Sequence, residues 1–580
     1  MFRFTQASAS LRPILSNLRQ NTGIIVPQNF QNFQNLRYNS TIEDLSEKIG
    51  TFKNDSLLLP NQQVNYFREQ LSLLNQYKRV SSDVEVFEVT FQNVIEIFKD
   101  EETRKNLIKV DLTKYLHFLN YSIFRNRRNR LDRRSNVDRD QYSNNQKLND
   151  VKYRNALLDF HSLLINGELN EKITLESLEY YFMSMSQYNL NEEIVNYWET
   201  GVNDEQLSKL FLNSRILSLV LPIAYETKRF SYEEILRIFE LNNDENKVDA
   251  KLLCSIGKIC TIENDYERAL DILESVLVIF ENSKDTRVGL SLGDLHLNFI
   301  SSSKDISIAK HFFDKVIEND LPYIVRLKVT HVIDLLNNCY ESEAPFEDIV
   351  YFYETTLKFY VSKKIKSNAQ FASLNNAFFK IFFQKYPQLN DESFSLLKKL
   401  MSDYNLILPV DELLLNTVIS NYNWGDKKIF EQLIEYYDIF KITKTQVPNR
   451  IILKKMGEVD YSDEEILNQW NNNLSNLDHD RYTYIPIADW AAIRDATIFS
   501  KFDRNTLYWQ IVKKYQNYFQ DYRATVRFIR LWFKDREIFK HLKALNEFND
   551  LPDLKFRNLK PTVDFTKIMN TTQLDEKWRK

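Results

Sequence analysis

Apolar residues recur along this chain at the i, i+3, i+4 spacing that places them on one face of an α-helix. In the first part of the chain this pattern predicts helices over residues 64–77, 84–98 and 112–124. Toward the end it predicts helices over 490–498, 507–519 and 524–545. The segment from Tyr484 to Ala496 is predicted to start a helix that Asp489 caps, with Ile487 before the cap.

One apolar stripe recurs between residues 153 and 455. Its clearest copy spans Asp265 to Glu274, and copies follow one another at spacings of 41, 34, 40, 40, 45 and 36 residues. An apolar residue stands three positions after the first residue of each copy, and another stands four positions after it except where Lys398 occurs. The first residues of the seven copies are Ile194, Ile235, Ala269, Ala309, Ile349, Phe394 and Phe430.

A repeat of this length indicates a helical hairpin that cannot bury its stripe alone, so that neighbouring hairpins must stack. We therefore predict an all-α fold, a right-handed α-solenoid of degenerate helical hairpins with an N-terminal helical region and a C-terminal helical cap. The alternative is an irregular helical domain, because helices rich in Leu and Ile offer such matches by chance. The predicted organisation is a transit peptide at 1–38, a helical region at 39–125, a basic polar loop at 126–152, the solenoid at 153–455, a C-terminal helical region at 456–560 and a flexible tail at 561–580.

Composition favours the helical prediction. The 580 residues include only nine glycines and twelve prolines, far below the usual shares of about 7% and 5%. Sheets and tight turns use glycine more than helices do. The three cysteines, Cys254, Cys260 and Cys339, form no CxxC pair, so we predict buried free thiols and no metal site.

The N-terminus has the features of a mitochondrial transit peptide. Four arginines and no acidic residue precede Glu43, and Leu11, Ile14, Leu15 and Leu18 share one helical face. Leu36-Arg37-Tyr38 resembles a matrix-protease site, which places cleavage near Tyr38 and Asn39. No apolar run approaches the roughly 20 residues of a spanning helix. We expect a protein of the mitochondrial matrix, with peripheral association with the inner membrane left open.

Several function classes lack their motifs in this sequence. The seven histidines form no HxxxH or HExxH, and GxGxxG, GxxxxGK[ST] and GxSxG are absent. We therefore predict that the protein is not an enzyme and uses no cofactor. The net charge of −4 excludes a uniformly basic nucleic-acid binder, but charge is uneven along the chain. Segments 101–160 and 513–560 each carry an excess of six basic residues, whereas 161–250 carries an excess of nine acidic ones.

The first basic segment holds six arginines within ten positions. Guanidinium groups pair with phosphate through two parallel hydrogen bonds and stack on bases. This crowding predicts an arm that contacts RNA or the ribosome, and a solvated linker is the alternative. The six residues are Arg125, Arg127, Arg128, Arg130, Arg133 and Arg134.

The second basic segment forms a stripe along one predicted helix, because its cations are spaced by 4, 3 and 4 residues. Aromatic residues precede it at helical spacing, and bases of single-stranded RNA stack on such side chains. The alternative is an ordinary amphipathic helix with its aromatic residues in the core. The candidate residues are Tyr515, Tyr518, Tyr522, Arg523, Arg527, Arg530 and Lys534.

A presequence, degenerate hairpins of 34–45 residues, two basic segments and no catalytic motif together resemble fungal mitochondrial pentatricopeptide-like gene-expression factors. That group includes ATPase expression proteins, translational activators and RNA stability factors. The resemblance implies a solenoid that holds single-stranded RNA. The repeats here lack the family's usual glycine and proline residues, so its base-reading positions are not transferred to this chain.

We therefore predict a matrix RNA-binding factor that supports processing, stability or translation of one or a few mitochondrial transcripts. Its expected partner is single-stranded mRNA or rRNA, with the mitoribosome as a further candidate. The alternative is a protein-binding scaffold, such as a mitoribosome-associated subunit or an assembly factor for a respiratory complex. The net charge of −8 that remains after removal of the four presequence arginines favours this alternative.

Overall fold

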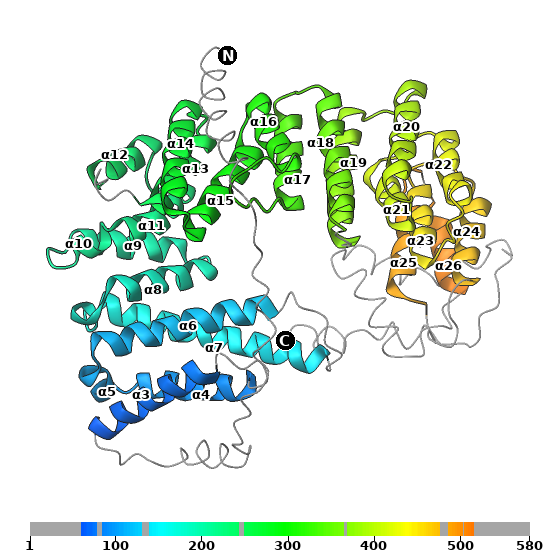
Figure 1. Ribbon diagram of the computed structural model, residues 1–580. Coiled ribbons are helices and arrows are strands. Elements are labelled where there is room, and N and C mark those ends of the chain that lie inside the picture. The colour runs from blue at the N-terminus through cyan, green and yellow to red at the C-terminus, as the bar shows by residue number, and fades with distance from the viewer. Residues whose placement is uncertain are drawn as a thin grey trace, which may run out of the picture. The chain divides into compact units, whose positions relative to one another are not determined.

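The computed structural model describes residues 60–77, 84–129, 139–242, 249–364, 368–475, 485–502 and 504–514 (Figure 1). Within these ranges every regular element is a helix. The predicted all-α architecture is therefore confirmed for the described part of the chain. The predicted transit peptide, its cleavage site near Tyr38 and Asn39, and the tail at 561–580 lie outside it.

The chain divides into two compact units. The first contains residues up to Phe299 together with Asn319–Arg326. Its helices are α3 (Pro60–Tyr77), α4 (Val84–Phe98), α5 (Glu101–Asn106), α6 (Lys109–Asn129), α7 (Arg139–Ile165), the 3-10 turn η2 (Asn170–Lys172), α8 (Leu175–Gln187), α9 (Asn191–Val202), α10 (Ser208–Phe211), α11 (Ser214–Glu226), α12 (Tyr232–Asn242), α13 (Ala250–Ile262), α14 (Tyr266–Ser283) and most of α15 (Thr286–Ser302).

The second unit contains Ile300–Glu318 and the chain from Leu327 onward. Its helices are α16 (Ile306–Ile317), α17 (Val329–Glu341), α18 (Phe346–Ser362), α19 (Asn368–Lys385), α20 (Asp391–Ile407), α21 (Glu412–Asn421), α22 (Lys427–Ile439), α23 (Gln446–Met456), α24 (Asp463–Ser475), α25 (Ile487–Thr497) and α26 (Asn505–Lys514).

Alternate helices form two rows within each unit. In the second unit α17, α19, α21, α23 and α25 each pack on the next member, and we call them the first row (Figure 1). In the first unit α6, α8, α11 and α13 form an equivalent first row. The helices that follow first-row helices in sequence form the second row. For example, α14 packs beside α13 and α22 packs beside α21. This is the stacking of hairpins that the repeat predicted.

The repeated stripe forms the buried face of the second row. All seven first residues of the copies are at most 3% exposed, which confirms the prediction that stacking buries them. The exception to the apolar rule, Lys398, lies half-buried with its Nζ 4.8 Å from the ring centroid of Phe394. Its aliphatic stem can cover the apolar surface while the ammonium group stays in water. The seven residues lie in α9, α12, α14, α16, α18, α20 and α22.

The hairpin turns explain how a chain with so few glycines can fold back repeatedly. Left-handed backbone conformations occur at Asn189, Asn264 and Lys228, with φ of 54°, 64° and 56°. Each of these residues lies between a first-row helix and the second-row helix that follows. Asparagine tolerates this region better than most residues. Side-chain caps such as Asp265, which accepts a hydrogen bond from the Arg268 amide, then start the next helix.

The structure differs from the predicted basic loop at 126–152. Helix α6 continues to Asn129, and α7 begins at Arg139, so helix occupies all of the described residues in this range. The early part of α7 lacks large aliphatic residues, but Tyr153, Leu157 and Phe160 farther along the helix are fully buried. Packing of that later half supports a long helix that local composition alone does not predict.

Asp489 does not cap α25 as predicted. Pro486 holds the N-cap position without a side-chain hydrogen bond, and Asp489 lies in the first turn with no exposed surface. Its carboxylate accepts two hydrogen bonds from Arg450 on α23, from Nε at 2.7 Å and from Nη2 at 2.6 Å. The residue therefore joins two first-row helices, because burial and a cation on the neighbouring helix outweigh its local capping tendency.

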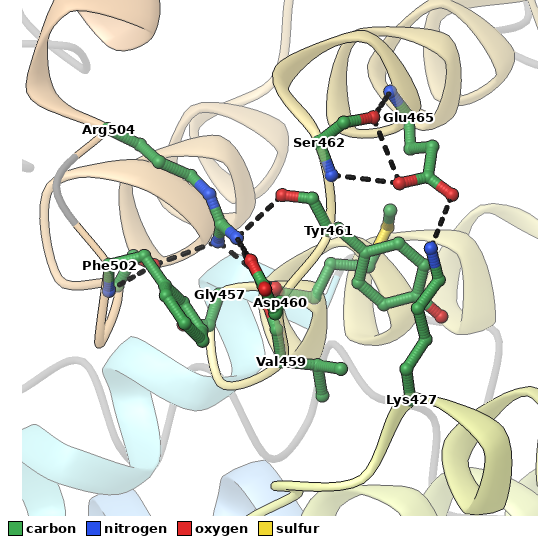
Figure 2. A network of polar contacts seen from close by, with 11 residues as sticks. Lys427, Gly457, Val459, Asp460, Tyr461, Ser462, Glu465, Phe502 and Arg504 are labelled. Carbon is green, nitrogen blue, oxygen red and sulfur yellow. Dashed lines mark hydrogen bonds and ion pairs between the residues drawn. The ribbon is translucent and has the colours of Figure 1, made fainter.

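A buried arginine ties the start of α26 to the turn between α23 and α24 (Figure 2). Arg504 is 5% exposed, and its guanidinium group donates to the backbone carbonyls of Val459 at 3.1 Å and Tyr461 at 2.7 Å. It also donates to the Met456 carbonyl at 3.3 Å. The turn needs Gly457, because a Cβ at this position would lie 2.3 Å from the Asp495 carbonyl oxygen. Helices α23, α25 and α26 thus meet closely around this turn.

Candidate nucleic-acid interface

Two of the six arginines in the first basic segment are packed against other helices. The guanidinium carbon of Arg125 lies 5.0 Å from the ring centroid of Phe87 on α4. That of Arg127 lies 4.7 Å from the ring centroid of Tyr188, which follows α8. Arg128 lies near the end of α6, and Arg130, Arg133 and Arg134 lie outside the described residues. Stacking on aromatic faces gives Arg125 and Arg127 a structural role.

Polar side chains surround these two arginines at the end of α6. Lys152 Nζ donates to Gln92 Oε1 at 3.0 Å, and Tyr188 Oη donates to the Asp150 carbonyl at 3.1 Å. The Nε atom of Arg127 lies 4.0 Å from Asp150 Oδ1. We call the polar group the α6-end cluster; it consists of Glu88, Gln92, Arg125, Asn126, Arg127, Asn149, Asp150, Lys152 and Tyr188.

The α6-end cluster contains unsatisfied buried atoms. Within the described residues, Arg125 Nη1, Arg127 Nε and Glu88 Oε2 have no hydrogen-bond partner. All three atoms are covered, so a phosphate could reach the two nitrogens only by displacing part of the cluster. For these two arginines the geometry therefore favours packing over an exposed RNA-gripping arm.

Glu88 makes the stability of this region depend on pH. Burial raises the pKa of Glu88 to about 7, against the opposing effect of Arg125 and Lys152. Between pH 4.5 and about 7 the folded state therefore binds more protons than the unfolded state, so the free energy of unfolding falls as pH rises through this window. Replacing Glu88 with glutamine should remove this fall, a gain of about 1–3 kcal/mol at pH 8 and almost none at pH 4.5.

Urea denaturation of the parent and Glu88→Gln proteins at several pH values measures this effect. The exposed Glu274 on α14 provides the matched control, because Glu274→Gln should leave the pH profile unchanged. Parallel pH profiles for the parent and Glu88→Gln proteins would contradict the prediction.

Uncharged amide and hydroxyl side chains gather on the exposed side of the first row in the second unit. Asn421 Nδ2 on α21 donates to Asn376 Oδ1 on α19 at 3.0 Å, which shows that the two helices present these groups side by side. Lys380, one turn after Asn376, is exposed. We call this surface the amide face; it consists of Asn376 on α19 and Asn421 on α21, with the exposed Ser420 beside Asn421.

The amide face has chemistry suited to nucleobases, because each amide offers both a hydrogen-bond donor and an acceptor. None of its residues is among the site residues predicted from the sequence. The available signal was the recurrence of asparagine on successive first-row helices. Its recognition required knowledge of which helices form that row.

The first row of the first unit carries charges that are largely neutralised. Glu179 on α8 forms ion pairs with Arg215 on α11 and with Lys251 on α13, the latter at 3.5 Å. These contacts link three successive first-row helices. The cations of this surface are therefore partly occupied by protein carboxylate.

The candidate residues of the second basic segment follow the last described helix. Tyr515, Tyr518, Tyr522, Arg523, Arg527, Arg530 and Lys534 all lie outside the described residues, directly after α26. The packing of Arg504 fixes the start of α26 and hence the point from which this segment continues.

The cysteines and acidic residues add no metal chemistry to the described part of the chain. Cys254, Cys260 and Cys339 are buried free thiols, as predicted. The described residues contain no group of three or more His, Cys, Asp or Glu placed to hold a metal ion. Among the described helices, none combines the length and the apolar character that crossing a membrane requires.

Three family models match successive parts of the chain. They describe the RMD9 N-terminal domain over residues 44–212, the RMD9 middle domain over 232–443 and the RMD9 C-terminal domain over 479–565. The third match includes the second basic segment.

Two relatives are similar to most of this chain. A Debaryomyces hansenii protein is 43% identical over 98% of this chain and 99% of its own length. A Meyerozyma guilliermondii protein is 43% identical over 82% of this chain and 77% of its own length. Both carry the name RNA-binding protein RMD9, mitochondrial. The solved structure of yeast Rmd9p in complex with a 16-nucleotide target RNA matches with a TM-score of 0.63 at 23% identity, over 85% of this chain and 99% of that one.

Proposed function

The chain belongs to the RMD9 family, and we propose from this membership that it is a mitochondrial RNA-binding factor. The observation that carries the proposal is the match over almost the whole chain to a protein named as mitochondrial and RNA-binding. The fungal RNA-factor family expected from presequence, repeats and basic segments is the family that the relatives identify.

The structure supports a binding function through the amide face. Two successive hairpins present neutral hydrogen-bonding groups side by side on α19 and α21, and such groups can pair with the edges of unstacked bases. Binding of this kind needs no covalent step, and we propose that the protein acts without catalysis. Protection of a transcript from nucleases, or its presentation to the ribosome, would follow from occupancy alone.

We place the protein in the matrix, where it would support processing, stability or translation of one or a few transcripts. Ultraviolet crosslinking in intact mitochondria, followed by sequencing of the bound RNA, tests this proposal. Recovery of defined segments well above that of a matrix enzyme is expected, and recovery at background would contradict it. Carbonate extraction and gradient sedimentation after nuclease treatment would report association with the inner membrane or the mitoribosome.

Charge reversal in the second basic segment tests whether its stripe holds phosphate. Replacing Arg523, Arg527 and Arg530 with glutamate is expected to weaken RNA binding by about 1 kcal/mol for each arginine, because each loses one phosphate contact. The slope of log affinity against log salt should become shallower by the contribution of about three phosphate contacts. Filter binding or fluorescence anisotropy across a salt series measures both quantities.

A matched triple variant controls for net charge. Glutamate at Lys228, Arg237 and Arg287, which are exposed in the first unit, reverses the same number of charges elsewhere. It should reduce affinity less and leave the salt slope nearly unchanged. Equal effects from the two triple variants would assign the stripe to general electrostatics, and unchanged affinity in a folded stripe variant would assign its helix to packing.

A further inference from the structure

The second unit contains a cavity of about 350 Å³ where the ends of α18 and α20 meet the beginnings of α19 and α21. Its walls are mainly apolar and include Val361, Phe371, Ala372, Leu408 and Leu413. Val361 is 39% exposed and Leu413 is 42% exposed, so apolar surface reaches the mouth. Cavities of this size with apolar walls and a few polar groups are typical of small-molecule sites.

The polar groups of the cavity retain unused hydrogen-bonding capacity. Asn375 is buried, and its Oδ1 accepts a hydrogen bond from Tyr353 Oη at 2.8 Å. Its Nδ2 donates to Tyr404 Oη at 3.4 Å, a long contact that uses only one of the two amide hydrogens. The second amide hydrogen of Asn375 and the hydroxyl hydrogen of Tyr404 are therefore available to an acceptor inside the cavity.

The next repeat contains a tyrosine–asparagine pair of the same kind. Tyr437, near the end of α22, donates to Asn416 Oδ1 on α21 at 2.8 Å, and both residues are buried. In the repeat that contains the cavity, Asn375 directs its carbonyl to Tyr353 on the preceding helix instead. The contact from Asn375 to the tyrosine of the following helix is thus 3.4 Å long beside the cavity, whereas the tyrosine–asparagine pair of the adjacent repeat has a hydrogen bond of 2.8 Å.

The mouth of the cavity carries charge of both signs. Lys364 and Asp411 both line it, and Lys363 beside Lys364 is exposed. Asp411 caps α21 by accepting from the Leu414 amide through Oδ1 at 2.9 Å, which leaves Oδ2 as a further acceptor. A ligand that fits must therefore combine a flat apolar body, hydrogen-bond acceptors at its inner edge, a donor toward Asp411 and negative charge toward Lys364.

We propose that this cavity binds a single unstacked nucleobase, with its phosphate directed toward Lys364. A base has the size and the flat faces for the apolar walls, ring and carbonyl acceptors for Asn375 and Tyr404, and exocyclic donors for Asp411. The inference rests on the proposed RNA-binding function and deepens it, because it assigns one nucleotide to one pocket. The base comes either from a bound RNA strand or from a free nucleotide.

Filling the cavity tests the proposal without altering surface charge. Ala372→Trp should occupy the space and weaken binding of the RNA segment recovered by crosslinking about tenfold, the loss expected for one stacked base. Because Lys364 is unchanged and one phosphate at most leaves it, the slope of log affinity against log salt should change by no more than the contribution of one phosphate contact. Gln370→Trp, on an exposed position of the same helix, is the matched control and should bind like the parent protein.

Two further measurements keep the proposal open to refutation. If Ala372→Trp fails to fold, Tyr404→Phe removes only the hydroxyl group and should weaken binding about threefold. Calorimetric titration of the four nucleoside monophosphates into the parent protein and Ala372→Trp distinguishes the sources. If a monophosphate binds the parent but not Ala372→Trp, the cavity takes a free nucleotide. If no monophosphate binds and Ala372→Trp loses only RNA affinity, the base comes from the RNA strand.

The proposal is overturned if the cavity variants bind both RNA and monophosphates as the parent does. In that case the parent still binds RNA, so the proposed function stands. Absence of RNA binding by the parent would instead contradict the proposed function, and the monophosphate titration would still test the cavity independently.

Discussion

Replacing Arg504 with methionine is expected to lower the free energy of unfolding by about 3–5 kcal/mol. The guanidinium group is nearly inaccessible to water and donates to the carbonyls of Met456, Val459 and Tyr461 as well as to Ser500 Oγ. Methionine fills similar space but donates nothing, so four hydrogen bonds from a charged group are lost. The Met456 and Val459 carbonyls keep the backbone N–H groups of Val459 and Tyr461 as donors, whereas the Tyr461 carbonyl loses its donor. A hydrogen bond that involves a charged group contributes about 1.5–3 kcal/mol.

Hydrogen exchange locates the loss as well as its size. Amides of residues 457–461 and of α26 should exchange faster in Arg504→Met, while those of α17 to α19 should change little. Arg504→Lys keeps the charge but cannot reach several carbonyls at once, so it should be almost as destabilising. Lys501→Met is the control, because Lys501 is exposed and, among the described residues, its Nζ donates one hydrogen bond, to the Trp424 carbonyl at 3.2 Å. A loss of less than about 1 kcal/mol for Arg504→Met would contradict the buried role.

Removal of Arg450 alone is expected to cost a similar amount, about 3–5 kcal/mol, because it leaves the carboxylate of Asp489 buried without a partner. Burial already raises the pKa of Asp489 above its ordinary value even with Arg450 beside it. In Arg450→Met the folded state should therefore take up a proton more readily than the unfolded state. The lost stability should return in part as pH falls toward 4.

A double replacement separates pairing from packing. Arg450→Met combined with Asp489→Leu removes both charges and should recover most of the stability that either single change loses, because buried ion pairs can be replaced by apolar side chains at little cost. Chemical denaturation of the four proteins gives the coupling energy directly. Additive losses in the double variant would show that the two residues act independently of each other.

The prediction for the repeats succeeded because it rested on a property local to each helix. Ile194, Ala269 and Phe430 recur at related positions since every hairpin must bury one face against its neighbours, and all three are fully buried. The helices at 64–77 and 84–98 were likewise predicted close to their observed bounds. Periodicity of apolar side chains carries this information without any knowledge of distant contacts.

The interpretation of single polar residues was less successful, because their roles depend on partners far away in sequence. Asp489 is of a residue type that often caps helices, but it pairs with Arg450, which lies 39 positions earlier. Arg125 belongs to a run for which RNA contact stays a prediction, and the stacking of its guanidinium on Phe87 could not be read from the sequence. The cavity beside Asn375 leaves no mark on the sequence, since its walls come from four helices.

The sequence by itself determined the helical class, the hairpin repeat and the family of RNA factors that the chain resembles. The physical reason is that helix period, scarcity of glycine and the need to bury a repeated stripe are all encoded locally. Only the tertiary structure decided which arginines are packed, which asparagines form the amide face and where a cavity remains. Those outcomes depend on which side chains neighbouring helices bring within a few ångströms of each other, and stacking sets that distance.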